Sequence, residues 1–169
     1  MIKSFQKVRI YDSKKFENCP IDVPMKMFLE VPKLSVNGFN ISGYVTVTDE
    51  VRGDVDMVIE ATRCSIDMKS CEKYQNINIR EMCTNFGRKN RYYTAVFAAI
   101  KPKVECPIKP GNYTLESTRL DLSGLRMFPL EGFVWILTFK LVSIEKKSKK
   151  VVFCLISELE VTRGSRRSK

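Results

Sequence analysis

The sequence predicts an all-β protein: a mainly antiparallel sandwich or cup with one short helix, stapled by disulfide bonds. Apolar and polar residues alternate with period two along several short segments, as expected for strands that bury one face. The final third reads as a long hairpin, and the six cysteines form an even set without the spacing of a metal site. A length of 169 residues suits one domain, which we expect to span residues 1–162.

Four strands are expected in the first part of the chain. Residues 7–11 alternate charged and bulky side chains, as an edge strand would, and residues 12–20 are expected to form a connector. Pro32 closes the second strand, and a turn at Arg52 and Gly53 separates the third from the fourth. The predicted strands are residues 7–11, 25–31, 39–48 and 54–62.

The pattern changes in the middle of the chain. Ile79, Met82 and Cys83 lie at helical spacing, which predicts the one short helix within residues 75–83. Residues 91–100 are apolar and end next to a proline, so they fit either a strand or a second helical turn. The remaining predicted strands are residues 113–115, 133–144 and 151–161, the last two flanking a lysine-rich tip.

An apolar segment without a clear period lies between the strands at 113–115 and 133–144. Gly124 and Pro129 interrupt it, so neither a helix nor a strand is expected there. It either packs into the core or guards the mouth of a lipid site and dips into a membrane, where each apolar side chain would gain ~1.5–3 kcal/mol. Its apolar members are Leu122, Leu125, Met127, Phe128 and Leu130.

The net charge of +10 favours an anionic partner such as a membrane surface. Residues 146–150 supply a lysine-rich hairpin tip, and residues 163–169 are expected to be a basic, disordered tail. No RNA- or DNA-binding motif accompanies this charge, so no nucleic acid partner is expected. The N-terminus lacks the apolar stretch of a signal peptide, so a secreted protein would be represented here by its mature form, with the signal peptide removed.

The cysteines predict disulfide bonds and therefore an oxidising compartment. The chain has no histidine and no C-x-x-C motif, which argues against zinc sites and against catalysis by a Cys–His or Ser-His-Asp arrangement. We therefore expect no enzymatic activity, no cofactor and no metal. Sequence alone does not choose among the possible pairings of Cys19, Cys64, Cys71, Cys83, Cys106 and Cys154.

Alternation along the strands assigns a set of apolar residues to the interior. In an ordinary sandwich these residues fill a core, whereas in a cup they line a lipid cavity, and both arrangements need the same apolar face. Trp135 fits either the wall or an interfacial anchor, and its place inside a strand favours the wall. The candidate lipid-binding residues are Phe28, Val45, Val47, Val55, Met57, Ile59, Phe97, Leu115, Trp135, Ile136, Phe139, Phe153 and Leu155.

Two N-glycosylation sequons begin at Asn40 and Asn112. They are compatible with passage through a secretory route, since oligosaccharides are added to such sites in secreted proteins.

The cysteine order carries a resemblance to a known family. Cys64 and Cys71 are separated by six residues, Cys83 follows near the expected helix, and residues 106–115 read Cys-Pro-Ile-Lys-Pro-Gly-Asn-Tyr-Thr-Leu. With an early and a late cysteine, this frame resembles that of the ganglioside GM2 activator-like proteins of the MD-2-related lipid-recognition superfamily. The match covers residues 16–161.

The resemblance implies a β-cup whose apolar interior holds lipid chains, without enzymatic activity. It implies a membrane-dipping role for the apolar segment at 122–130, and a hydrolase or a receptor as partner. It further implies the pairs Cys19–Cys154, Cys64–Cys71 and Cys83–Cys106. The chain lacks one further disulfide of the activator frame, so residues 85–105 are expected to be less tied down.

Three functions are compatible with these observations. The first is a secreted or endolysosomal protein that extracts a lipid from anionic membranes and carries it. The second is a chemosensory carrier that presents a hydrophobic, pheromone-like ligand to a receptor. The third is a structural or toxin-like binding protein whose core is filled.

Overall fold

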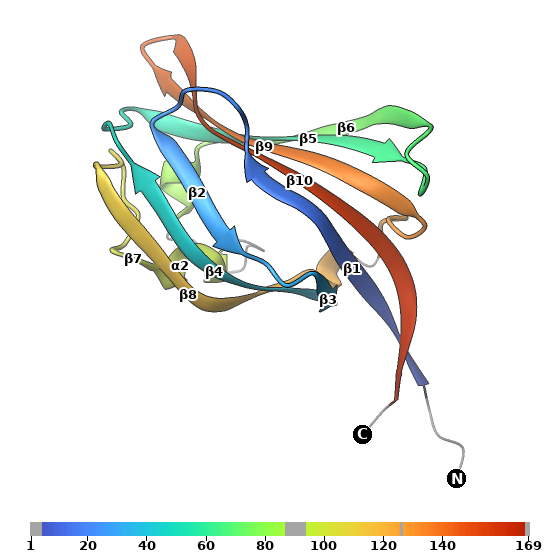
Figure 1. Ribbon diagram of the computed structural model, residues 1–169. Coiled ribbons are helices and arrows are strands. Elements are labelled where there is room, and N and C mark those ends of the chain that lie inside the picture. The colour runs from blue at the N-terminus through green and yellow to red at the C-terminus, as the bar shows by residue number, and fades with distance from the viewer. Residues whose placement is uncertain (1–4, 87–93, 126, 168–169) are drawn as a thin grey trace.

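Two antiparallel sheets pack face to face in the computed structural model, which describes residues 5–86, 94–125 and 127–167 (Figure 1). The large sheet contains, in spatial order, β3 (Leu34–Val36), β1 (Phe5–Asn18), β10 (Ser148–Arg167), β9 (Phe133–Glu145), β5 (Asp54–Cys64) and β6 (Cys71–Ile79). The small sheet contains β2 (Met25–Glu30), β4 (Gly38–Val47), β8 (Gly111–Asp121) and β7 (Ile100–Lys101). The predicted all-β class is confirmed.

Helical structure in the described residues is limited to short pieces. These are α1 (Met82–Asn85), α2 (Thr94–Ala99) and a 3₁₀ turn at Ser123–Leu125. The prediction of a helix within residues 75–83 is wrong over most of its length, because β6 occupies residues 71–79 and pairs with β5. Isoleucines at 77 and 79 also satisfy period two, and pairing with a neighbouring strand decides the conformation.

The segment at residues 91–100 contains α2 followed by the first residue of β7, and residues 91–93 lie outside the described residues. The hairpin at the end of the chain is confirmed, with β9 and β10 joined at a tight turn. Lys146 and Lys147 form this turn, both with positive φ.

The first strand is longer and more central than predicted. β1 continues to Asn18 through the region expected to be a connector, and it pairs with β10 on one side and β3 on the other. A register shift between Ser13 and Lys15 lets the strand continue, and such a bulge blurs the alternation on which the prediction relied.

The basic end of the chain is ordered over most of its length. Residues 163–167, predicted to belong to a disordered tail, continue β10 and pair with residues 5–9 of β1. Figure 1 shows these two strands leaving the body of the molecule together toward the two termini. Pairing with β1 satisfies the backbone hydrogen bonds of this segment, although its sequence offers little apolar surface to bury. Residues 168 and 169 lie outside the described residues.

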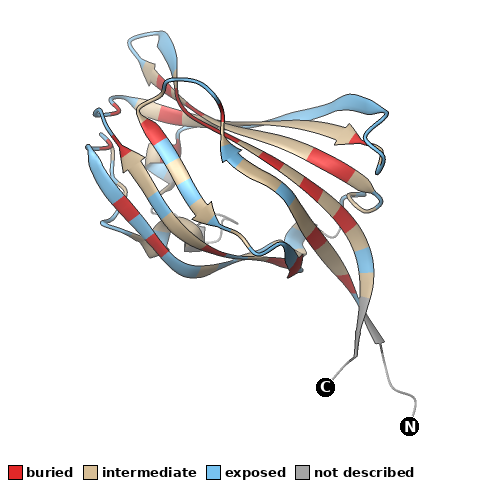
Figure 2. Ribbon diagram, in the orientation of Figure 1, coloured by how far each residue is buried: buried red, intermediate tan, exposed pale blue. Residues whose placement is uncertain are grey.

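Most of the buried apolar side chains belong to two clusters, and Figure 2 shows where buried residues lie along the strands. Core cluster 1 fills the end of the sandwich near α1 and α2 and consists of Met25, Val47, Val51, Val55, Met82, Ile108, Tyr113, Leu141, Val152, Phe153 and Leu155. Core cluster 2 consists of Tyr11, Trp135, Leu159 and Val161. The hydrophobic core is therefore divided into two parts.

All six cysteines are paired as the resemblance implies. The bonds are Cys19–Cys154, Cys64–Cys71 and Cys83–Cys106, at Cα–Cα distances of 5.4, 4.1 and 5.8 Å. Three disulfides in one small domain indicate an oxidising environment, as is found outside cells or in a lumen. Among the described residues, every helix falls short of the length and apolar character that a bilayer span requires.

Candidate ligand pocket and adjoining loop

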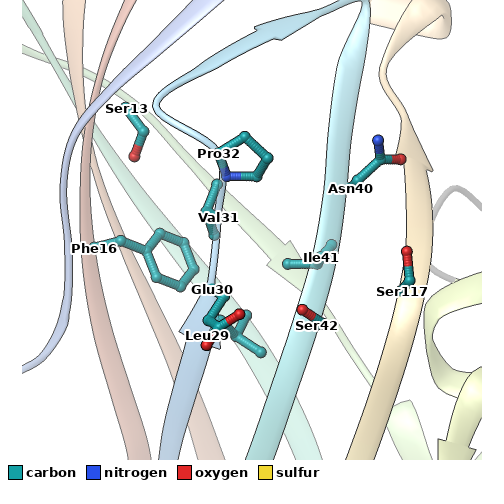
Figure 3. A pocket seen from close by; sticks show the side chains of 10 residues that line it. All are labelled: Ser13, Phe16, Leu29, Glu30, Val31, Pro32, Asn40, Ile41, Ser42 and Ser117. Carbon is teal, nitrogen blue, oxygen red and sulfur yellow. The ribbon is translucent and has the colours of Figure 1, made fainter.

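A pocket of about 650 Å³ lies where the small sheet and the large sheet part (Figure 3). β2 pairs with β4 as far as Glu30, opposite Ser42. The chain then turns away at Val31 and Pro32 and joins the large sheet as β3. We call this site the seam pocket, and its lining residues are Ser13, Phe16, Leu29, Glu30, Val31, Pro32, Asn40, Ile41, Ser42 and Ser117.

The seam pocket occupies the gap between the two core clusters. Along β1, Tyr11 belongs to core cluster 2, and the pocket begins two residues later at Ser13. Along β4, Phe39 packs against core cluster 2, Ile41 lines the pocket and Val47 belongs to core cluster 1. Both strands therefore pass from one cluster, past the pocket, to the other.

The pocket has an apolar floor and a polar rim. Ile41 is buried, and the Phe16 and Leu29 side chains beside it in Figure 3 are half-buried. The exposed rim includes Glu30 and Asn40. A volume of several hundred cubic ångströms is typical of small-molecule sites, which measure about 300–1,000 Å³.

None of the thirteen residues predicted to bind lipid lines the seam pocket. Most of them fill core cluster 1 or pack against it instead, so this part of the predicted cup interior is a packed core. The residues in this position are Val45, Val47, Val55, Met57, Phe97, Phe139, Phe153 and Leu155. Trp135 is buried in core cluster 2, where its indole Nε1 donates a hydrogen bond to the Leu130 carbonyl oxygen at 2.9 Å.

Two of the predicted interior residues lie on the outer faces of their sheets. Phe28 is 45 % exposed and stacks on Tyr44, with ring centroids 5.1 Å apart. Ile136 alternates with Trp135 and therefore points to the opposite face of β9. Apolar residues occur on both faces of β2 and β9, so the pattern alone assigns neither correctly. Of the other two, Leu115 is buried and Ile59 is partly exposed.

Sequence reasoning missed the apolar floor of the pocket. Phe16 lies in the segment that was expected to be a connector, so its side chain was not considered part of a strand. Ile41 has the same parity as Val45 and Val47 and could have been found from the alternation of β4. Leu29 lies on the same face of β2 as Met25 and Met27. The prediction placed Phe28 in the interior, which assigned Leu29 to the opposite face.

The apolar loop at residues 122–130 is partly packed and partly exposed. Leu122 and Leu130 pack against core cluster 2, and Leu125 is half-buried in the 3₁₀ turn. Met127 is 92 % exposed and Phe128 is 53 % exposed. The ends of the loop are thus anchored, while its tip presents two large apolar side chains to solvent.

Arg9 holds the loop in place from β1. Its guanidinium donates hydrogen bonds to the carbonyl oxygens of Leu125 at 2.9 Å and Phe128 at 3.0 Å, and its Nε to the Glu131 carboxylate at 3.3 Å. Glu131 also accepts a hydrogen bond from Arg163 Nε at 2.8 Å. The planar guanidinium bonds several acceptors at once, which a lysine ammonium does less well.

Burial raises the pKa of the Tyr11 hydroxyl, and the neighbouring Arg9 guanidinium partly offsets that effect. Tyr11 is 2 % exposed, and its hydroxyl has no hydrogen-bond partner among the described residues.

The two sequon asparagines are exposed and lie in the small sheet, Asn40 in β4 and Asn112 in β8. Asn40 also belongs to the rim of the seam pocket, so an oligosaccharide there would border the opening. Within the part of the chain that the structure describes, no group of three or more acidic or cysteine side chains could hold a metal ion.

Comparisons with known proteins leave the family open. No protein-family model matches the sequence, and no curated protein matches it. The resemblance to the lipid-recognition superfamily stays a prediction that rests on the cysteine frame and its pairing.

Proposed function

We propose that this protein binds a lipid or another hydrophobic small molecule in the seam pocket and carries it between membranes or to a partner protein. The observation that carries this proposal is the seam pocket itself. Its apolar floor lies between two packed clusters, and its volume suits a small ligand. A carrier of this kind would work in an extracellular or endolysosomal compartment, to which the three disulfides are suited.

The exposed loop tip supports contact with a membrane. Moving the Met127 and Phe128 side chains from water into lipid would gain ~1.5–3 kcal/mol each. This amount favours reversible docking over permanent insertion, as a carrier requires. The net charge of +10 adds attraction to anionic lipids, because basic groups near such a surface each contribute about 1 kcal/mol.

Ligand binding is tested by extracting the purified protein with organic solvent and analysing the extract by mass spectrometry. We expect one class of hydrophobic compound in a fixed molar ratio to the protein. A protein that yields no such compound, and that also fails to bind an apolar fluorescent probe, would contradict the proposal.

Membrane docking is tested by sedimentation with vesicles that contain anionic phospholipid. We expect Phe128→Asp to reduce the bound fraction at least ten-fold, since it removes an apolar side chain and adds a negative charge. Phe28→Asp is the matched control, because Phe28 is an exposed aromatic residue outside the loop and should affect binding much less. Equal losses in the two variants would show that the loop tip has no special role.

A further inference from the structure

The volume of the seam pocket limits the size of its ligand. A methylene group occupies about as much space as a water molecule in the liquid, ~30 Å³. A pocket of about 650 Å³ therefore has room for roughly twenty non-hydrogen atoms. This accommodates one alkyl chain with a small head group, whereas a phospholipid with two membrane-length chains exceeds it in its chains alone.

The pocket combines an exposed rim that carries polar groups with an apolar floor. Half of the lining residues are polar, and they are Ser13, Glu30, Asn40, Ser42 and Ser117. Glu30, Asn40 and Ser117 are exposed at the rim, whereas the floor at Ile41 is apolar. An amphiphile fits this gradient with its chain on the floor and its head group at the rim.

The charge at the rim discriminates between head groups. Among the described residues that line the pocket, only Glu30 has a charged side chain, and it stands at the end of β2. Its carboxylate accepts hydrogen bonds from hydroxyl or ammonium groups but repels a carboxylate or a phosphate. No lysine or arginine is among the lining residues that the structure describes.

We infer that the seam pocket selects a single-chain amphiphile whose head group is uncharged and hydroxylated or carries an amine, in preference to a fatty acid or a two-chain phospholipid. The inference rests on the proposed function and names the chemical class of its ligand. It also separates two charge preferences within one molecule, because the surface as a whole attracts anionic membranes while the pocket disfavours an anionic ligand.

The test is displacement of a bound apolar naphthylamine probe by matched fourteen-carbon compounds at 150 mM salt. We expect the primary alcohol and the primary amine to displace the probe at about two- to five-fold lower concentrations than the carboxylate, the range of an exposed charge interaction. Glu30→Gln should abolish the advantage of the amine over the carboxylate. Glu105→Gln removes another exposed carboxylate that does not line the pocket and should leave the order unchanged.

Site and selectivity are distinguished by a second variant. Ser117→Trp places a bulky side chain at an exposed rim position, so it should fold normally and weaken all of the single-chain ligands at least five-fold. If the ligands respond to Ser117→Trp but the carboxylate binds as well as the amine, or a two-chain phospholipid competes equally, the inference on ligand class is overturned and the proposed function stands. If no compound displaces the probe, or Ser117→Trp changes nothing, both the inference and the assignment of the function to this pocket are overturned.

Discussion

Arg9 and Tyr11 stand two residues apart on one face of β1 and have contrasting hydrogen-bonding environments. Arg9 bonds the loop carbonyls and Glu131, whereas the Tyr11 hydroxyl is buried without a partner among the described residues. The Tyr11 ring contributes apolar contact, with its centroid 5.3 Å from that of Phe39. The hydroxyl therefore costs free energy at the same site where the ring contributes it.

Tyr11→Phe should leave the protein equally stable at pH 7 or stabilise it by up to about 1 kcal/mol, because the variant removes an unpaired buried hydroxyl. The pKa of Tyr11 is raised in the folded state, so the unfolded chain loses its proton first as the pH rises. The raised pKa of Tyr11 therefore has no effect on stability well below pH ~10, the pKa of an unperturbed tyrosine, and lowers stability above it.

The measurement is urea-induced unfolding of the native protein and of Tyr11→Phe at pH 7, 9 and 10.5. We expect the native protein to lose more free energy of unfolding above pH 10 than the variant does. Parallel curves for the two proteins over this range would contradict the assignment of a raised pKa to Tyr11.

At the scale of single residues, the sequence identifies apolar side chains more reliably than it identifies the face that each occupies. Val47 is buried as predicted, because the opposite face of β4 is more polar and carries Asn40, Ser42 and Thr46. Phe28 fails this rule, since it alternates with Met27 and Leu29, which are also apolar. Only the partner sheet decides which of the two faces is covered.

Among the secondary-structure elements, β4 sets the position at which the seam pocket opens. Gly43 in β4 has φ +151°, and a Cβ placed there would lie 2.1 Å from the Phe28 carbonyl oxygen of β2. Close approach of the two strands therefore depends on glycine at this position. β2 leaves β4 just beyond this approach, and the pocket opens at the point of departure.

Gly43→Ala should destabilise the protein by about 2–3 kcal/mol, because the new Cβ must push β2 away and the backbone remains strained. Gly111→Ala is a close control: φ is +146° there, but a Cβ at Gly111 meets nothing within 4 Å. The difference in unfolding free energy between Gly43→Ala and Gly111→Ala measures the cost of the clash. The affinity of Gly43→Ala for an apolar probe should also fall. A Gly43→Ala variant no less stable than Gly111→Ala would show that β2 does not need this approach.

The elements themselves were predictable where one strand alternates regularly and poorly predictable where pairing overrides the pattern. Residues 39–48 and 54–62 match β4 and β5 closely. β6 was mistaken for part of a helix, because its conformation is imposed by β5 and by the disulfide between Cys64 and Cys71. Contacts of this kind join residues on different strands, so they produce no periodic pattern in the sequence.

For the whole molecule, the seam pocket arises from a change of sheet by the chain between β2 and β3. No local sequence pattern predicts this change from the small sheet to the large sheet, apart from Pro32, which cannot donate a hydrogen bond to continue β2. The fold class was accessible from the sequence pattern and the disulfide pairs from the family resemblance, whereas the position of the pocket required the arrangement of both sheets.

The disulfides link parts of the molecule over very different lengths of chain, which predicts unequal contributions to stability. Cys19 and Cys154 are 135 residues apart and join the end of β1 to β10, whereas Cys64 and Cys71 are 7 residues apart within one hairpin. In the chain-entropy model the first bond stabilises the fold by about 5 kcal/mol and the second by about 2 kcal/mol.

Replacing each pair by alanine tests this difference. Each pair contains one cysteine that is at most 3 % exposed, Cys154 or Cys64, but Cys19 is also buried whereas Cys71 is exposed, so lost packing adds to the difference between the two pairs. We expect Cys19→Ala with Cys154→Ala to lower the free energy of unfolding by about 3 kcal/mol more than Cys64→Ala with Cys71→Ala, as measured by urea denaturation. Equal losses would mean that the hydrogen bond from the Cys19 amide to the Cys154 carbonyl and the surrounding strand pairing already hold β1 to β10, so that the long-range crosslink adds little.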